Sequence, residues 1–136
     1  MITHPKIGIV GLGYVGLPLA VAFSKNFNVI GLDISEFRIA ELKSGIDSTL
    51  EVEGHSLKGN KKISFTCNVN DLSTCNYIII TVPTPVDSNN LPDLSPLVSA
   101  SRTIGSILQK NVTVIYESTV YPGATEEICV PILELE

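Results

Sequence analysis

Three glycines near the N-terminus have the spacing of a turn that binds phosphate groups. Gly11, Gly13 and Gly16 form a Gly-x-Gly-x-x-Gly pattern that follows a short apolar run and opens a helix-like segment. Gly11 would allow the tight turn, Gly13 would let a pyrophosphate approach the backbone, and Gly16 would let the helix lie close to the first strand. The pattern therefore predicts a dinucleotide site.

Two backbone amides and two charged side chains extend this prediction. The N–H groups of Tyr14 and Val15 would point out of a helix N-terminus, where unpaired donors and the helix dipole favour an anion. Asp33 lies about 20 residues downstream, the distance expected for a carboxylate that binds the adenosine ribose. This carboxylate would repel a 2′-phosphate and favours NAD over NADP. Arg38, one helical turn further, could instead accept a 2′-phosphate or bond to the ribose side of the cofactor.

Hydroxyl, carboxylate and thiol groups also gather near the C-terminus. Ser118 and Thr119 follow a predicted strand, at the edge of a sheet where such folds bind ligands. Glu126 and Glu127 would lie in the first turn of a helix, where acids oppose the helix dipole. A reactive thiol needs a nearby cation and partial exposure, and Cys129 has neither, so we expect buried packing for it.

Strands that alternate with helices would position these residues. Strands are predicted over residues 6–10, 27–33, 62–68, 76–82 and 111–118. Helices are predicted over residues 14–26, 35–45, 95–110 and 122–136, the last of them interrupted by Pro131. The central strands are apolar on both faces, which indicates a parallel sheet covered on both sides. We predict a doubly wound, Rossmann-like α/β fold of about five strands, with residues 1–136 as one dinucleotide-binding domain.

Composition and charge exclude several other classes of protein. The net charge is −5 and no basic patch occurs, which argues against a nucleic acid partner. Three cysteines without Cys-x-x-Cys spacing and two isolated histidines predict no disulfide framework and no metal site. The apolar N-terminal run contains four glycines and Pro18, which predicts neither a signal peptide nor a membrane span. We expect a cytoplasmic protein with reduced and mostly buried thiols.

Five segments, in order and at matching spacing, carry a family resemblance. They read KIGIVGLGYVGLPLA, GLDISEFRI, TVPTPVD, PDLS and ESTVYPGATEE. Together they resemble the NAD-binding N-terminal domain of the UDP-glucose/GDP-mannose dehydrogenase family. The segment GIDSTLEVE resembles the branch that oxidises UDP-N-acetylhexosamines, including the Vi-polysaccharide type.

The resemblance implies an activity and a role for individual residues. Members of the family oxidise the C6 alcohol of a nucleotide sugar to a carboxylate, with two NAD molecules in succession and a cysteine thiohemiacetal. By similarity, the pyrophosphate would meet Tyr14 and Val15, and the adenosine end would meet Asp33 and Arg38. Further along the cofactor would lie Pro83 and Thr84, and then Ser118, Val120 and the catalytic residue Thr119, near the nicotinamide and the reacting carbon.

The resemblance also implies parts that this sequence does not contain. The family's catalytic lysine, asparagine, cysteine and aspartate lie well downstream, in segments that this sequence lacks. The family's central helix and second domain are also expected further along the chain. Residues 51–62 are shorter than the corresponding family segment. We therefore expect a fragment that binds NAD but is inactive alone, and a full-length protein that is a homodimer or higher oligomer with a UDP-sugar substrate.

Two other interpretations share the glycine pattern. One is a non-catalytic domain that senses NAD. The other is the cofactor domain of a 3-hydroxyacid or 6-phosphogluconate type of dehydrogenase, which would use a lysine in an all-helical second domain.

Overall fold

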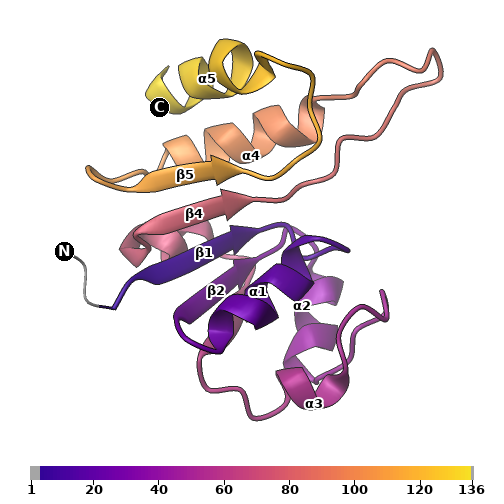
Figure 1. Ribbon diagram of the computed structural model, residues 1–136, viewed down its shortest axis with the longest axis vertical. Coiled ribbons are helices and arrows are strands. Elements are labelled where there is room, and N and C mark those ends of the chain that lie inside the picture. The colour runs from indigo at the N-terminus through magenta and orange to yellow at the C-terminus, as the bar shows by residue number, and fades with distance from the viewer. Residues whose placement is uncertain (1–3, 136) are drawn as a thin grey trace.

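Five parallel strands form the single sheet of the protein in the computed structural model, which describes residues 4–135 (Figure 1). The strands run in the order β3-β2-β1-β4-β5 across the sheet. Their bounds are β1 (Lys6–Val10), β2 (Asn28–Leu32), β3 (Ile63–Thr66), β4 (Tyr77–Ile80) and β5 (Thr113–Tyr116). The chain leaves β1 toward β2 and β3, then crosses to β4 on the other side. The carboxyl end of β1 is therefore the switch point at which this class of fold binds ligands.

Helices cover both faces of this sheet. One face is covered by α1 (Gly16–Ser24), α2 (Glu36–Lys43) and α3 (Gly54–Leu57). The other face is covered by the 3₁₀-helix η1 (Val69–Thr74), by α4 (Ser95–Gly105), by the π-helical turn η2 (Thr125–Cys129) and by α5 (Val130–Leu135). Each face has its own apolar core, and the central strands contribute to both because they are buried on both sides.

The predicted fold is confirmed, and most predicted elements are present with shorter bounds. Ser35 caps α2, because its hydroxyl accepts the Arg38 N–H at 3.2 Å, and Gly45 ends the helix with a left-handed φ of 77°. The Asp93 carboxylate accepts the Ser95 N–H at 2.9 Å where α4 begins.

The helix predicted over residues 122–136 is not regular. The five-residue π-helical turn η2 comes directly before α5, and Pro131 is the second residue of α5. A proline cannot donate a hydrogen bond to the preceding turn, so the helix widens at this point. Within residues 4–135, no helix combines the length and the apolar content needed to cross a membrane.

Candidate functional site

The glycine-rich turn lies at the carboxyl end of β1, against the end of β4. Gly11 has a left-handed φ of 92°, and its N–H donates to the Leu32 carbonyl at 2.8 Å. A Cβ atom on Gly16 would lie 1.7 Å from the Gly11 carbonyl oxygen and 2.4 Å from the Thr81 hydroxyl. Only glycine fits at the start of α1, because the helix packs directly onto the turn.

The outer side of the same turn is open. A Cβ atom on Gly13 would have no neighbouring atom within 4 Å, and the side chains of Tyr14 and Val15 are exposed. Among residues 4–135, the N–H groups of Gly13, Tyr14 and Val15 donate to no acceptor. Free amides at the N-terminus of α1, beside open space, fit the pyrophosphate of a dinucleotide.

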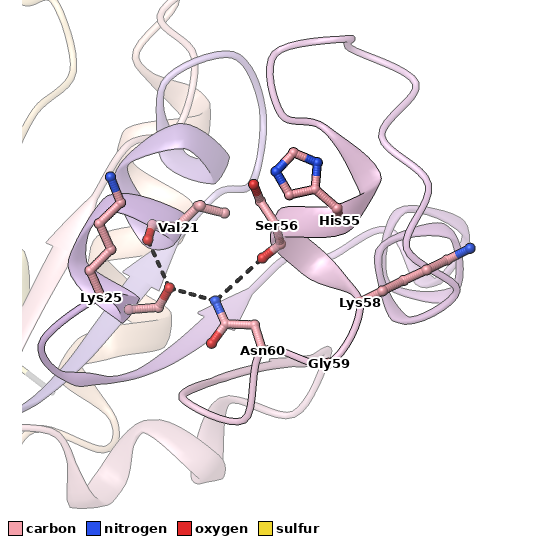
Figure 2. Close-up of a pocket in the computed structure, with 8 residues that line it drawn as sticks. Val21, Lys25, His55, Ser56, Lys58, Gly59 and Asn60 are labelled. Carbon is pink, nitrogen blue, oxygen red and sulfur yellow. Dashed lines mark hydrogen bonds between the residues drawn. The ribbon is translucent and has the colours of Figure 1, made fainter.

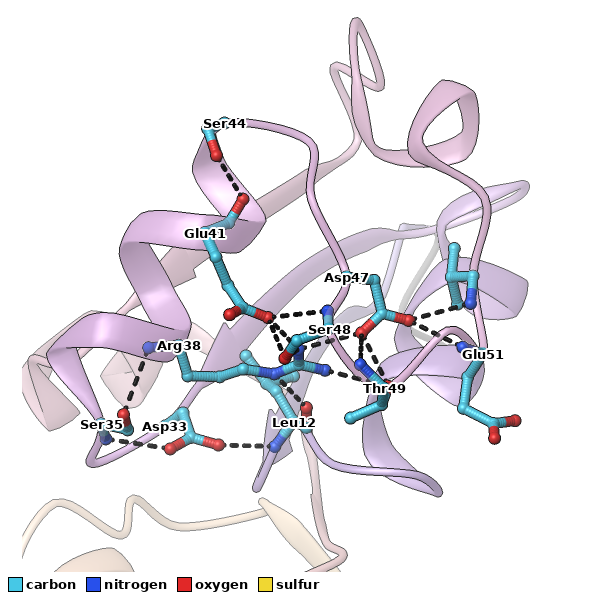
Figure 3. A network of polar contacts seen from close by, with 11 residues as sticks. Leu12, Asp33, Ser35, Arg38, Glu41, Ser44, Asp47, Ser48, Thr49 and Glu51 are labelled. Atoms are coloured by element: carbon cyan, nitrogen blue, oxygen red, sulfur yellow. Dashed lines mark hydrogen bonds and ion pairs between the residues drawn. The ribbon is translucent and has the colours of Figure 1, made fainter.

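Asp33 joins the end of β2 to this turn. One carboxylate oxygen accepts the Leu12 N–H at 2.9 Å, and the other accepts the Ser35 N–H at 2.9 Å (Figure 3). Each oxygen has two lone pairs, so each retains one position for a ribose hydroxyl. Asp33 can therefore shape the turn and bind a ribose at the same time.

Arg38 is more enclosed than its sequence position suggests. The residue is only 9% exposed, and its Nε donates to the Leu12 carbonyl at 2.8 Å. Its guanidinium also forms ion pairs with Glu41 and with Asp47, the latter at 2.9 Å. The contact with the adenosine end stays a prediction, and the charged atoms of Arg38 are bonded to other residues of the protein.

The loops that follow β4 and β5 are bonded to each other. The Thr84 hydroxyl donates to the Thr119 carbonyl at 2.7 Å, and the Ser118 hydroxyl donates to the Val82 carbonyl at 2.7 Å. Thr119 is exposed, and within residues 4–135 its hydroxyl has no hydrogen-bond partner. These contacts bring the two predicted segments together and leave the Thr119 hydroxyl free for a ligand.

The remaining predicted residues lie at the same junction. Pro83 is exposed at the start of the loop after β4, whereas Val120 packs partly buried against the core beside α4. The predicted residues thus follow the carboxyl edge of the sheet, from the end of β2 past β1 and β4 to the end of β5.

Thr81 is a site residue that the sequence analysis missed. Its buried hydroxyl lies 2.7 Å from the Gly11 carbonyl oxygen and 3.0 Å from the Val10 carbonyl oxygen. It therefore bonds the glycine-rich turn to the end of β4. The available signal was a single hydroxyl residue that ends an otherwise apolar strand sequence.

The three thiols lie in different environments. Cys129 is fully buried, as expected, and burial raises its pKa. Burial also raises the pKa of Cys75 to about 11. Cys67 is exposed, so the expectation of a mostly buried set holds for two of the three. Across the part of the chain that the structure describes, no three His, Cys, Asp or Glu side chains converge as metal ligands.

A hollow of about 300 Å³ lies at the opposite end of α1 from the glycine-rich turn (Figure 2). Asn60 lines it, and its amide donates to the Ser24 hydroxyl at 2.8 Å and to the Ser56 carbonyl at 3.3 Å. These two bonds link the α3 segment to the end of α1. None of the predicted site residues lines this hollow.

Comparison with known proteins agrees with this geometry. Residues 5–136 match the UDP-glucose/GDP-mannose dehydrogenase family, NAD binding domain. A UDP-N-acetyl-D-glucosamine 6-dehydrogenase of Pseudomonas aeruginosa is 62% identical over 129 residues, and one of Salmonella typhi is 52% identical over 132 residues. The two matches cover 95% and 97% of this chain but 31% of each relative, so the chain spans about a third of their length.

A solved structure gives the same result. The UDP-D-ManNAc dehydrogenase of Pyrococcus horikoshii superimposes with a TM-score of 0.89 at 36% identity, over 96% of this chain and 32% of the other. The family predicted from the sequence is thus confirmed, and so is NAD as the cofactor of its domain. The chain belongs to the UDP-glucose/GDP-mannose dehydrogenase family and corresponds to the NAD-binding domain of that family.

Proposed function

We propose that this chain is the cofactor-binding part of a dehydrogenase that oxidises the C6 alcohol of a UDP-N-acetylhexosamine to a carboxylate. The observation that carries the proposal is the open glycine-rich turn, with its three free amides, beside the Asp33 carboxylate. The names of the relatives that are 62% and 52% identical support the substrate class.

Each residue of the site has a defined task in this proposal. The Tyr14 and Val15 amides hold the pyrophosphate, and Asp33 accepts hydrogen bonds from the adenosine ribose. The free Thr119 hydroxyl, held in place through its own carbonyl by Thr84, orients the reacting end. NAD, when bound there, accepts a hydride from the sugar carbon. Conversion of an alcohol to a carboxylate takes two such oxidations and one water, so two NAD are reduced for each sugar.

The proposal places the nucleophilic cysteine outside this domain. Cys75 and Cys129 are buried with raised pKa values, and a thiolate is the form that attacks an aldehyde. Cys67 is exposed on the far side of β2 from the β4–β5 junction, because it follows β3 at the opposite end of the sheet. We further propose that the whole protein is a cytoplasmic homodimer or higher oligomer.

Family membership separates this proposal from its rivals. An NAD sensor needs no free hydroxyl at the nicotinamide end, where Thr119 lies in our proposal. Dehydrogenases of the 3-hydroxyacid type share the fold, but relatives named as UDP-sugar dehydrogenases match this chain over 95% or more of its length.

A turnover assay tests the proposed reaction. The longer protein that contains this domain should form two NADH for each UDP-N-acetylhexosamine consumed, whereas the 136-residue chain should form none. Turnover by the chain alone would contradict the proposal. Oxidation of a 3-hydroxyacid but of no UDP-sugar by the longer protein would also contradict it.

A further inference from the structure

Both backbone polar groups of Leu12, in the glycine-rich turn, are bonded to charged residues. Asp33 accepts its N–H at 2.9 Å, and the Arg38 Nε donates to its carbonyl oxygen at 2.8 Å. Figure 3 shows the Arg38 side chain running past Leu12, with its guanidinium directed toward Asp47 and Thr49. The only base close to the ribose-binding carboxylate along α2 thus points into the protein.

Two carboxylates neutralise this guanidinium where it lies. The side chains of Arg38, Glu41 and Asp47 are 11%, 8% and 0% exposed. Both carboxylates pair with the same terminal nitrogen of Arg38, and the other terminal nitrogen approaches the Thr49 hydroxyl at 3.4 Å. If Arg38 moved away, two buried carboxylates would be left without their ion-pair partner, which is destabilising. The two ion pairs therefore favour the buried position of Arg38.

The loop of residues 47–52 fixes the position of Asp47. Its carboxylate accepts the Thr49 N–H at 3.0 Å, the Thr49 hydroxyl at 2.7 Å, and the Glu51 and Val52 N–H groups at 2.9 Å each. Burial alone would raise the pKa of Asp47, but these bonds and the one from Arg38 hold it at about 2. Asp47 is therefore ionised at neutral pH and fixed before any cofactor arrives.

We propose that Asp47 and Glu41 help to determine the choice of cofactor, by holding Arg38 against the Leu12 carbonyl and away from a 2′-phosphate. The inference rests on the proposed function, since it concerns the same NAD site. Exclusion of NADP then has two parts. Asp33 repels the added phosphate, and the two carboxylates keep Arg38, the base of α2 nearest to Asp33 in the sequence, from binding it.

A double-mutant cycle separates these two parts. Asp33→Ser removes the repulsion, and Asp47→Asn loosens the arginine while keeping an acceptor oxygen for its loop. Calorimetry with NAD and NADP gives the ratio of the two affinities for each variant. We expect Asp33→Ser to shift the ratio toward NADP about tenfold and Asp47→Asn to shift it little. The double variant should shift it at least about tenfold beyond the product of the single shifts, which is about 1.4 kcal/mol of coupling.

The Arg38→Gln change tests whether Asp47 acts through the arginine or only supports its own loop. In the Asp33→Ser/Asp47→Asn background, Arg38→Gln should abolish the gain in NADP affinity, because the released arginine is its source. Asp87→Asn is the matched control, since the Asp87 carboxylate also accepts two backbone N–H groups of its loop, from Asn89 and Leu91, but pairs with no arginine. Asp33→Ser/Asp87→Asn should behave as Asp33→Ser alone.

The outcomes are distinguishable. If Asp47→Asn does not fold by circular dichroism, Glu41→Gln replaces it, because this change weakens the same pairing and keeps the Ser48 contacts. Additive shifts in the cycle, or a gain that survives Arg38→Gln, would overturn the inference and leave the NAD site intact. Absence of NAD binding by the unaltered chain would instead overturn the proposed function.

Discussion

Gly13 and Gly16 lie three residues apart in one turn, yet a side chain would meet opposite surroundings at the two positions. A Cβ atom on Gly16 would overlap the Gly11 carbonyl, whereas one on Gly13 would meet open space. At the scale of single residues, Gly16 is needed by the fold and Gly13 by the ligand.

The two alanine variants should therefore differ in which property they lose. Gly16→Ala should lower the free energy of unfolding by at least about 1–3 kcal/mol, because helix and turn must move apart. Gly13→Ala should change it by less than about 0.5 kcal/mol, but should weaken NAD binding at least about tenfold, since the methyl group occupies the approach of the pyrophosphate. Denaturant unfolding and calorimetry measure the two effects. Equal stabilities of the two variants would contradict this account.

Thr119 and its neighbour Ser118 provide a second contrast. The Thr119 hydroxyl is free, whereas the Ser118 hydroxyl donates to Val82. In the longer protein, Thr119→Ala should lower kcat about tenfold, the value of one hydrogen bond of about 1.4 kcal/mol, and should leave NAD affinity nearly unchanged. Thr119→Ser should restore the rate. If Thr119→Ala has full activity, its assignment as the catalytic residue is wrong.

Local sequence patterns predicted the glycine-rich turn and the place of Asp33 after a strand, but they did not reveal which contacts hold these residues. The glycines and Asp33 are spaced by one strand and one helix, so their positions follow from short-range order. Two partners of Arg38, Asp47 and Thr49, come from the loop of residues 47–52. Thr81, which directly follows β4, is 70 residues away from Gly11 in the sequence. Such contacts depend on the packing of distant segments and leave no periodic signal.

At the scale of elements, a buried polar cluster joins β5 to the helices behind it. The Tyr116 hydroxyl lies 2.7 Å from the Ser101 hydroxyl, which itself donates to the Leu97 carbonyl at 2.8 Å. Cys129 of η2 is fully buried. After burial, which is the main cause, it also raises the pKa of Tyr116. The cluster fixes β5 at the point where the chain continues into Ser118 and Thr119.

Removal of the Tyr116 hydroxyl tests this cluster. Tyr116→Phe should lower the free energy of unfolding by about 1–2 kcal/mol near neutral pH, because the Ser101 hydroxyl loses a buried partner. Burial raises the pKa of Tyr116 from 10.0 to about 12, so the folded state binds this proton more tightly than the unfolded state. Unaltered protein should therefore lose stability as the pH rises from about 10 to about 12.

The Tyr116→Phe variant should lose less stability than unaltered protein between about pH 10 and about pH 12, since it lacks the hydroxyl that titrates there. Tyr77→Phe is the matched control, because this tyrosine is 37% exposed and begins β4, whereas Tyr116 ends β5. Guanidinium unfolding at several pH values measures all three proteins. An identical alkaline loss in Tyr116→Phe and in unaltered protein would exclude the proposed contribution of this residue.

The geometry of the C-terminal helices could be predicted only in part from the sequence. Pro131 predicted an irregular helix, because proline lacks a donor, and the structure has a π-helical turn directly before α5. The sequence did not show whether the helix would kink, end or widen, since that depends on how Cys129 and Leu133 pack onto the core beside α4. Strand order likewise became visible only in the assembled sheet.

At the scale of the whole molecule, two apolar cores enclose one parallel sheet and leave its carboxyl edge for ligands. The protein has three thiols, of which Cys75 and Cys129 are buried and Cys67 is exposed. Native protein should therefore show one rapidly reacting thiol with Ellman's reagent, and denatured protein three. Cys67→Ser should remove the rapid phase. A rapid phase that persists in this variant would show that one of the cores is open.

The most direct test of the central claim is calorimetric titration of the chain with NAD and with NADP. The open turn, the free amides and Asp33 together predict one saturable NAD site for each chain, and binding of NADP at least about tenfold weaker. Gly13→Ala should weaken the NAD signal without unfolding the protein. Absence of NAD binding by folded chain, or equal affinities for the two cofactors, would contradict the account.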